Sequence, residues 1–119
     1  LQDVLRTMEE REIRTYYVYS SASIRDALYT MYPTFTEERV KRNIHVRVIA
    51  IGEGGSDQPL AERKWLTKET GGATYIILYR DKTAFIALDT SKTPLGVIIA
   101  DESIAKTQKM LFEHLWKTL

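Results

Sequence analysis

A group of polar side chains at the end of the first predicted strand could bind a ligand. Tyr19, Ser20 and Ser21 end a strand-like run, and the helix that follows carries Arg25. Hydroxyl donors beside the N-terminus of a helix suit an anionic or hydroxylated ligand. The same residues are also explained without a ligand, because tyrosines pack on strands and a serine caps the following helix. Both interpretations stay open at the level of the sequence.

A glycine-rich stretch, GEGG at residues 52–55, follows a second strand-like run and suggests a phosphate-binding loop. The dinucleotide-binding pattern requires glycine where Asp57 stands, and no Gly-Lys-Ser/Thr follows, so neither of the common phosphate-loop motifs is complete. A flexible surface loop explains these glycines better. The stretch nevertheless follows the C-terminal end of a central strand, where open α/β sheets bind their ligands.

The two histidines are candidates for acid–base chemistry. His45 falls within a predicted strand and His114 lies on the last predicted helix beside Glu113. Neither histidine has a serine or carboxylate partner at a catalytic spacing, and the chain contains no Gly-x-Ser-x-Gly elbow. We therefore expect structural or surface roles for both.

The composition excludes several classes of site. The 119 residues include no cysteine and only two histidines, so we expect no disulfide, no thiolate nucleophile, no metal site and no cofactor. The 17 Lys and Arg residues nearly balance the 16 Asp and Glu residues, which gives these residues no broad attraction for nucleic acid. No apolar run is long enough for a membrane span or a signal peptide, which predicts a cytoplasmic domain without a membrane partner.

The hydrophobic pattern predicts an α/β domain in which helices flank a mixed β-sheet. We expect strands at residues 15–19, 44–51, 75–79, 84–88 and 95–100, with the second and the last of these buried. We expect helices at residues 24–31, from Thr34 or Thr36 to Arg42 with Asn43 as the stop, and from Asp101 to the end, the last one packed on the sheet. Residues 60–70 fit a short helix or, around 63–67, an edge strand, and the pattern slightly favours the strand.

The N-terminal segment carries an apolar stripe. Leu1, Val4, Leu5 and Met8 recur at the i, i+3, i+4, i+7 spacing of one helix face. Such a stripe must be buried, either on the sheet of the same chain or against a second copy as a short coiled-coil-like seam. We nominate these four residues for contacts in a homodimer, with packing in the chain's own core as an equal alternative.

Four segments resemble the C-terminal effector domain of TrmB-type transcription regulators. They are YVYSS, EERVKRNIHVRVIA, YIILYRDKTAFIAL and PLGVIIADESIAKTQKMLFEHLWKTL. The resemblance implies a phospholipase-D-like fold, with residues 1–12 as the end of a connecting, dimerising helix and residues 13–119 as the effector domain. It also implies that DNA is contacted only through a helix-turn-helix domain that this chain does not include.

The resemblance includes a hairpin motif and allows a test for catalysis. Residues 78–84 match the family pattern Ile-Tyr-Gly-Asp-Lys-Val-Ala, with Arg80 in place of the turn glycine, so a positive φ there would strain the backbone. Phospholipase-D-type enzymes use His-x-Lys-x4-Asp. With Asp81 as the aspartate, Thr74 and Ile76 occupy the histidine and lysine positions. Neither can attack phosphorus or hold phosphate in those roles, so we expect no enzyme activity.

These observations predict a non-enzymatic effector and dimerisation domain of a TrmB-type regulator, with a small molecule as its candidate effector. The ligand cleft is expected near the ends of the strands and on the adjoining helix, at Tyr19, Ser20, Ser21, Arg39, Arg47 and Glu53. Two alternatives stay open. One is a phosphodiesterase or nuclease of phospholipase-D type with displaced catalytic residues, among which His45 is a candidate, and the other is a pure oligomerisation module.

Overall fold

The computed structural model describes residues 1–10, 14–55 and 57–119. Six strands form one sheet in the order β3-β2-β1-β4-β5-β6. They are β1 (Thr15–Ser21), β2 (His45–Ile51), β3 (Ala61–Thr67), β4 (Thr74–Tyr79), β5 (Lys82–Leu88) and β6 (Pro94–Ala100). The β1–β2 and β2–β3 pairs are parallel, whereas the pairs from β1–β4 to β5–β6 are antiparallel. The predicted mixed sheet is confirmed.

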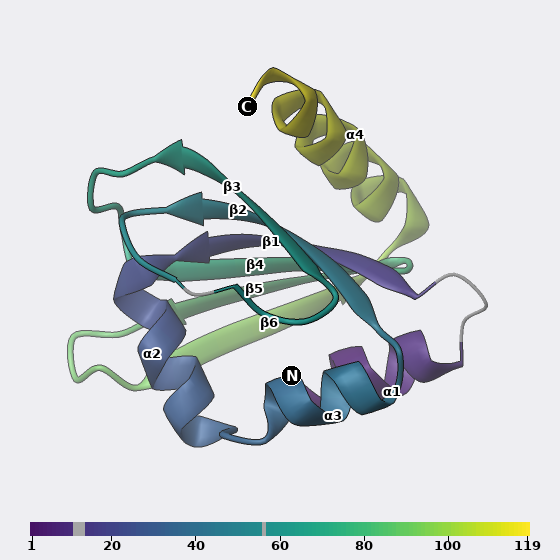
Figure 1. Ribbon diagram of the computed structural model, residues 1–119, viewed down its shortest axis with the longest axis horizontal. Helices are drawn as coiled ribbons and strands as arrows, with labels where there is room; N and C mark the ends of the chain where they lie inside the picture. The colour runs from purple at the N-terminus through teal and green to yellow at the C-terminus, as the bar shows by residue number, and fades with distance from the viewer. Residues whose placement is uncertain (11–13, 56) are drawn as a thin grey trace.

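Helices cover both faces of this sheet. They are α1 (Gln2–Glu9), α2 (Ala22–Met31), α3 (Phe35–Lys41) and α4 (Glu102–Thr118). Figure 1 shows α4 on one side of the sheet, with α1 and α3 on the other. The larger core joins α1, α2 and α3 to side chains such as Tyr16, Val18 and Ile77. The predicted flanking of the mixed sheet by helices, with the C-terminal helix packed on it, is confirmed.

The second core lies under α4. Phe112 is fully buried there, and its ring centroid lies 5.1 Å from that of Tyr17 and 5.2 Å from that of Tyr19. The apolar stripe of α4 is only partly buried, since Ile104 and Leu111 remain 40% and 55% exposed. A single helix is too narrow to cover a six-stranded face. Among the described residues, no helix has the length and hydrophobicity to cross a membrane.

Two local signals define helix ends as the sequence predicts. Asn43 has a φ of 55° directly after α3, the left-handed conformation that commonly ends a helix. At the start of α4 the backbone N–H of Ile104 donates to Oδ2 of Asp101 at 2.8 Å. This is the side-chain cap expected from an aspartate at that position.

The described residues between β2 and β3 form no helix, although the two strands are parallel. Val46, near the start of β2, pairs with Ala61 at the start of β3, so the chain between the strands must return along the whole length of β2. We call the described residues of this connection, 52–55 and 57–60, the return loop. Its far end is fixed where the backbone N–H of Val46 donates to the carbonyl of Leu60 at 3.0 Å. The favoured strand within residues 60–70 is confirmed, and β3 lies at an edge of the sheet.

The last strand differs from its prediction. The apolar run at residues 95–100 indicated a buried strand, but β6 is the other edge of the sheet. Leu95, Val97 and Ile98 are 57%, 54% and 51% exposed. The residues of β6 are apolar on both faces of the sheet. The following helix, α4, begins at the end of β6 but crosses toward β2 and β3. There, Lys64 Nζ donates to the carbonyl of Trp116 at 2.7 Å. Burial of β6 was therefore predicted wrongly.

The stripe of α1 packs on the chain's own sheet. Val4, Leu5 and Met8 are 1%, 1% and 2% exposed, and Leu1 packs against the edge of the same core. This is the core-packing alternative of the two that the periodicity allows. An intermolecular seam through these residues is not what the structure shows, because three of the four side chains have no surface left for a partner.

Candidate functional site

The hydroxyl-bearing side chains at the end of β1, those of Tyr19, Ser20 and Ser21, lie in different surroundings. Tyr19 packs on Phe112 under α4, and burial raises the pKa of its phenol. Ser20 pairs with Tyr75 on the opposite face and is 3% exposed, because successive strand residues point to opposite faces. Ser21 is fully buried, with its Oγ 2.7 Å from Oγ of Ser23. These hydroxyls do not converge on one ligand, in contrast to the nominated cleft.

Arg47 and Glu53 do not meet either. Nε of Arg47 lies 3.7 Å from Oε1 of Glu62, and its guanidinium lies 5.6 Å from the centroid of the Trp116 ring beneath α4. Glu53 is exposed in the return loop. Arg47 points to the α4 face because it lies one residue from Val48, whose side chain belongs to the core of the other face.

Arg39 has a structural role instead of a place in a cleft. It is 2% exposed, and its Nη1 donates to the carbonyls of Ile44 at 2.8 Å and Leu60 at 3.2 Å. Its Nη2 donates to the carbonyl of Pro59 at 2.8 Å. A buried charge is tolerated where hydrogen bonds satisfy it. Arg39 therefore anchors the end of the return loop to the start of β2, and these contacts do not favour its nomination as a ligand contact.

The positions that align with a phospholipase-D motif lie at the two ends of one strand. Thr74 begins β4, whereas Asp81 lies in the turn beyond its other end. His45 and His114 are exposed. Within residues 1–10, 14–55 and 57–119, no group of three or more His, Asp or Glu residues could hold a metal ion.

A cavity of about 380 Å³ lies beneath the return loop. This volume falls within the range of small-molecule sites. Its lining comes from α2, the start of α3, the return loop and β3: Arg25, Asp26, Tyr29, Thr36, Gly55, Gln58 and Arg63. The lining is mainly polar, and two of its members are arginines from different elements.

Both arginines have a buried nitrogen without a partner. Nη1 of Arg25 and Nη1 of Arg63 are shielded from solvent and make no hydrogen bond to the described residues. The ion pair of Arg25 is weak, because its Nε lies 3.8 Å from Oδ1 of Asp26, whose side chain is 92% exposed. Buried polar atoms almost always have a partner in native proteins. This pair is therefore the strongest indication of a ligand site in the described chain.

The glycines of the return loop bring its backbone against these guanidinium groups. A Cβ atom on Gly55 would lie 2.8 Å from Cζ of Arg63, and one on Gly54 would lie 3.2 Å from Nη2 of Arg25. Both glycines also have positive φ, +98° at Gly54 and +94° at Gly55. Glycine is required here for space at Gly55 and for conformation at both positions. Gly55, the last residue of the GEGG stretch, thus lines the cavity, and Gly54 lies beside Arg25.

The two arginines also act on each other electrostatically. Burial lowers the pKa of Arg63, the positive charge of Arg25 lowers it further, and Tyr29, Tyr75 and Asp57 act in the opposite direction. Guanidinium groups carry a positive charge in proteins. The cavity therefore brings two like charges together.

Only part of this site could be found in the sequence. Arg25 belongs to the hydroxyl cluster but was not nominated, and Arg63 lies in the segment whose secondary structure was ambiguous. The glycine-rich stretch was the one available signal, and it was correctly placed at the end of a central strand. Which arginines face it depends on how β3 and α2 pack.

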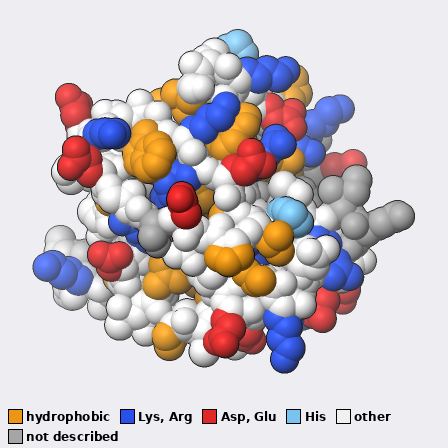
Figure 2. Space-filling model, viewed as in Figure 1, with side chains coloured by type: hydrophobic (Ala, Val, Ile, Leu, Met, Phe, Trp, Pro, Cys, Tyr) orange, Lys and Arg blue, Asp and Glu red, His pale blue; other side chains and the backbone are white. Residues whose placement is uncertain are grey.

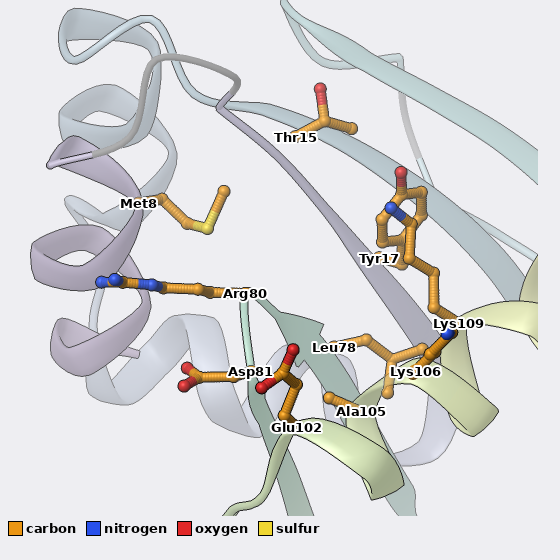
Figure 3. A pocket seen from close by; sticks show the side chains of 10 residues that line it. All are labelled: Met8, Thr15, Tyr17, Leu78, Arg80, Asp81, Glu102, Ala105, Lys106 and Lys109. Atoms are coloured by element: carbon orange, nitrogen blue, oxygen red, sulfur yellow. The ribbon is translucent and has the colours of Figure 1, made fainter.

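A second cavity, of about 540 Å³, is shown in Figure 3. It lies between α1, the start of β1, the β4–β5 turn and the first half of α4. Lys106 and Lys109 project from α4 beside Tyr17, and Lys109 Nζ lies 5.4 Å from that ring centroid. Asp81 and Glu102 line the same space with carboxylates. Its charges are mixed and exposed, so they select no particular ligand.

Comparison with known proteins gives one likeness. No family model matches the chain, and no curated protein matches it. A solved structure of TrmBL2, described as an archaeal chromatin protein with a novel mode of DNA binding, superposes with a TM-score of 0.58. The chain shares its fold with TrmBL2. The match covers 98% of this chain and 48% of TrmBL2 at 11% identity, so this chain spans about half of that protein and the likeness concerns the fold alone.

Proposed function

We propose that this chain is a non-enzymatic regulatory domain of a TrmB-type DNA-binding regulator. The observation that carries the proposal is the likeness to TrmBL2, which extends over 98% of this chain but only 48% of a protein that binds DNA. Since this chain matches only about half of such a protein, we propose that the other half contacts DNA. Fold alone does not define function, so the residues of the site must support the assignment.

The residues favour binding over catalysis. Among the described residues, the lining of the cavity beneath the return loop includes two arginines, an aspartate, a glutamine, a tyrosine and a threonine but no histidine. On the strand where phospholipase-D-type enzymes carry their motif, Thr74 and Ile76 stand at the positions of the nucleophile and the phosphate-binding lysine. We therefore propose a phospholipase-D-like scaffold that lacks the chemistry of the enzymes.

The helical layer connects the cavity to α1. Tyr29 of α2 and Thr36 of α3 line the cavity, and Nε of Arg42 at the end of α3 lies 3.5 Å from Oε2 of Glu9 at the end of α1. A ligand that draws α2 and α3 toward the return loop would shift α1 through this contact. In the proposed regulator α1 continues the connecting helix, so that shift would reach the DNA-binding domains of a homodimer.

The proposal is tested by comparing this chain with the full-length protein that contains it. We expect duplex DNA to bind the full-length protein, and not this chain alone at physiological salt, because the chain has a net charge of only +1. We also expect no hydrolysis of bis(4-nitrophenyl) phosphate by either. Hydrolysis that is lost in His45→Ala would replace the proposal with the enzyme alternative.

The homodimer is tested separately by the solution mass across a concentration series. A dimer whose stability does not respond to any small molecule would favour the pure oligomerisation module, because a ligand that binds only the native state must stabilise it.

A further inference from the structure

We propose that the cavity beneath the return loop binds the phosphate group of a small phosphorylated molecule through Arg25 and Arg63. The site itself follows from the cavity and from two guanidinium nitrogens that have no partner in the part of the chain that the structure describes. Only its role as the effector site rests on the proposed function.

The three arginines along the return loop differ in their hydrogen-bond acceptors, and this difference indicates a ligand. Arg39 donates to carbonyls of Ile44, Pro59 and Leu60, so backbone oxygens satisfy its charge. Arg25 and Arg63 lie against the glycines of the same loop, yet Nη1 of each has no acceptor among the described residues. An arginine that only secured the loop would use its carbonyls, as Arg39 does. An anion in the cavity supplies the acceptors that the loop does not.

The geometry of guanidinium favours a phosphate monoester as this anion. A guanidinium group presents a planar fork of N–H donors, and one fork satisfies one carboxylate. Two forks on different walls suit the three terminal oxygens of a phosphate monoester. They lie against Gly54 and Gly55, which are adjacent in the chain with Cα atoms about 3.8 Å apart. The double negative charge of phosphate would also offset the repulsion between the two arginines.

The remaining lining indicates that the phosphate carries a small polar group. The cavity volume of about 380 Å³ exceeds what a bare phosphate fills. Tyr29 and Thr36 add hydroxyl groups, and Asp26 adds an acceptor for a ligand hydroxyl. Two carboxylates already interact electrostatically with the arginines, Asp26 with Arg25 and Asp57 with Arg63. The site is therefore less suited to a polyanion than to a compact ligand.

The test is isothermal titration of this chain with inorganic phosphate and with glycerol 3-phosphate at constant ionic strength. We expect both to bind, glycerol 3-phosphate more tightly, and each of Arg25→Gln and Arg63→Gln to weaken binding by on the order of tenfold or more. Arg47→Gln is the matched control, because it removes the same charge from the opposite face of the sheet, and we expect its affinity to equal that of the wild type. No binding by the wild type at millimolar phosphate, or equal weakening by all three variants, would overturn the inference.

Thermal unfolding separates a ligand site from a structural arginine. Without an anion, Arg63→Met should melt at a higher temperature than the wild type, because it removes a partly buried charge beside Arg25 whose Nη1 has no partner among the described residues. Phosphate should raise the melting temperature of the wild type and not that of Arg63→Met. A lower melting temperature of Arg63→Met in phosphate-free buffer would show that Arg63 supports the fold and would overturn the inference.

A competition experiment with DNA identifies the source of the phosphate. If a short duplex binds this chain in competition with glycerol 3-phosphate and both are lost in Arg25→Gln, the site contacts the DNA backbone and the small-molecule inference fails. The inference and the proposed function can fail independently. Phosphate binding is measured on this chain alone, whereas the regulatory proposal is judged by DNA binding of the full-length protein.

Discussion

Tyr79 donates a hydrogen bond of 2.8 Å from its Oη to Oδ2 of Asp3, a residue 76 positions earlier in the chain. Lys82 Nζ donates to the same oxygen at 3.0 Å. The carboxylate of Asp3 therefore ties the first turn of α1 to the end of the β4–β5 hairpin. This connection holds the helix through which we propose that the domain communicates.

The Asp3 cluster makes stability depend on acid pH. Burial raises the pKa of Asp3, but hydrogen bonds from Tyr79, Lys82 and Arg6 outweigh it and lower the pKa to about 2. Since the folded pKa lies below the ordinary value of 3.8, this stabilisation is complete above pH 3.8 and is lost as the pH falls toward about 2. Asp3→Asn should lower the free energy of unfolding at neutral pH by on the order of 1 kcal/mol.

The check is urea unfolding of the wild type and Asp3→Asn between neutral pH and about pH 2. The two free energies should converge as Asp3 protonates. Asp26→Asn is the control, because its side chain is 92% exposed, and it should change the free energy of unfolding much less than Asp3→Asn does. A constant difference between wild type and Asp3→Asn over the whole pH range would contradict the role given to Asp3.

Leu5 distinguishes core packing of α1 from an intermolecular seam. Because Leu5 is 1% exposed, Leu5→Ala should reduce the free energy of unfolding by about 2–5 kcal/mol. The solution mass of the folded variant should not change. Leu66→Ala, at a leucine that is 45% exposed, serves as the control and should cost little stability. If Leu5→Ala dissociates a dimer without loss of monomer stability, the α1 stripe forms an intermolecular contact instead.

Arg39 anchors the return loop, and its removal should be visible locally. Arg39→Met leaves three carbonyls with fewer donors and should cost about 2–4 kcal/mol of stability. The amide of Val46 should exchange faster with solvent, because its acceptor is the carbonyl of Leu60, which Arg39 also binds. Arg47→Met, on the other face, should leave the exchange of Val46 unchanged. Unchanged protection of Val46 in Arg39→Met would refute the anchoring role.

Arg80 carries the strain expected of a residue in place of a turn glycine. Tyr79 pairs directly with Lys82, so Arg80 and Asp81 form a two-residue hairpin loop, and Arg80 has a φ of 62°. Arg80→Gly should therefore raise the free energy of unfolding by about 0.5–1 kcal/mol in thermal denaturation. Asp81→Gly, where φ is not positive, should instead lower it. Equal effects of the two substitutions would show that backbone conformation is not the cause.

Features that depend on neighbouring residues could be read from the sequence. Asn43 ends α3 in the left-handed conformation, and Asp101 caps α4 with its side chain. Alternation of apolar residues identified the strands, and their order along the chain indicated a mixed sheet. These signals act over a few residues, so their physical basis is contained within the segment itself.

Features that depend on contacts between distant segments could not be read in this way. The apolar run of β6 is compatible with a central strand, and only the order of the sheet makes it an edge. Arg39, Arg47 and Arg63 lie on similar polar positions in the sequence. Because of the way α3, β2 and β3 pack, Arg39 donates to backbone carbonyls, Arg47 pairs with Glu62 and Arg63 lines the cavity.

The sequence by itself determined the glycine-rich loop and most of the helices and strands, including the helix ends at Asn43 and Asp101, because local propensity, capping and periodicity act within each segment. Only the tertiary structure decided that Arg25 and Arg63 meet beneath that loop. Along the chain, α3 and β2 lie between the elements that carry them, and their proximity results from the pairing of β3 with β2 and the packing of α2 on the sheet. Sequence spacing does not record such pairings, since they are set by the burial of apolar surface across the whole domain.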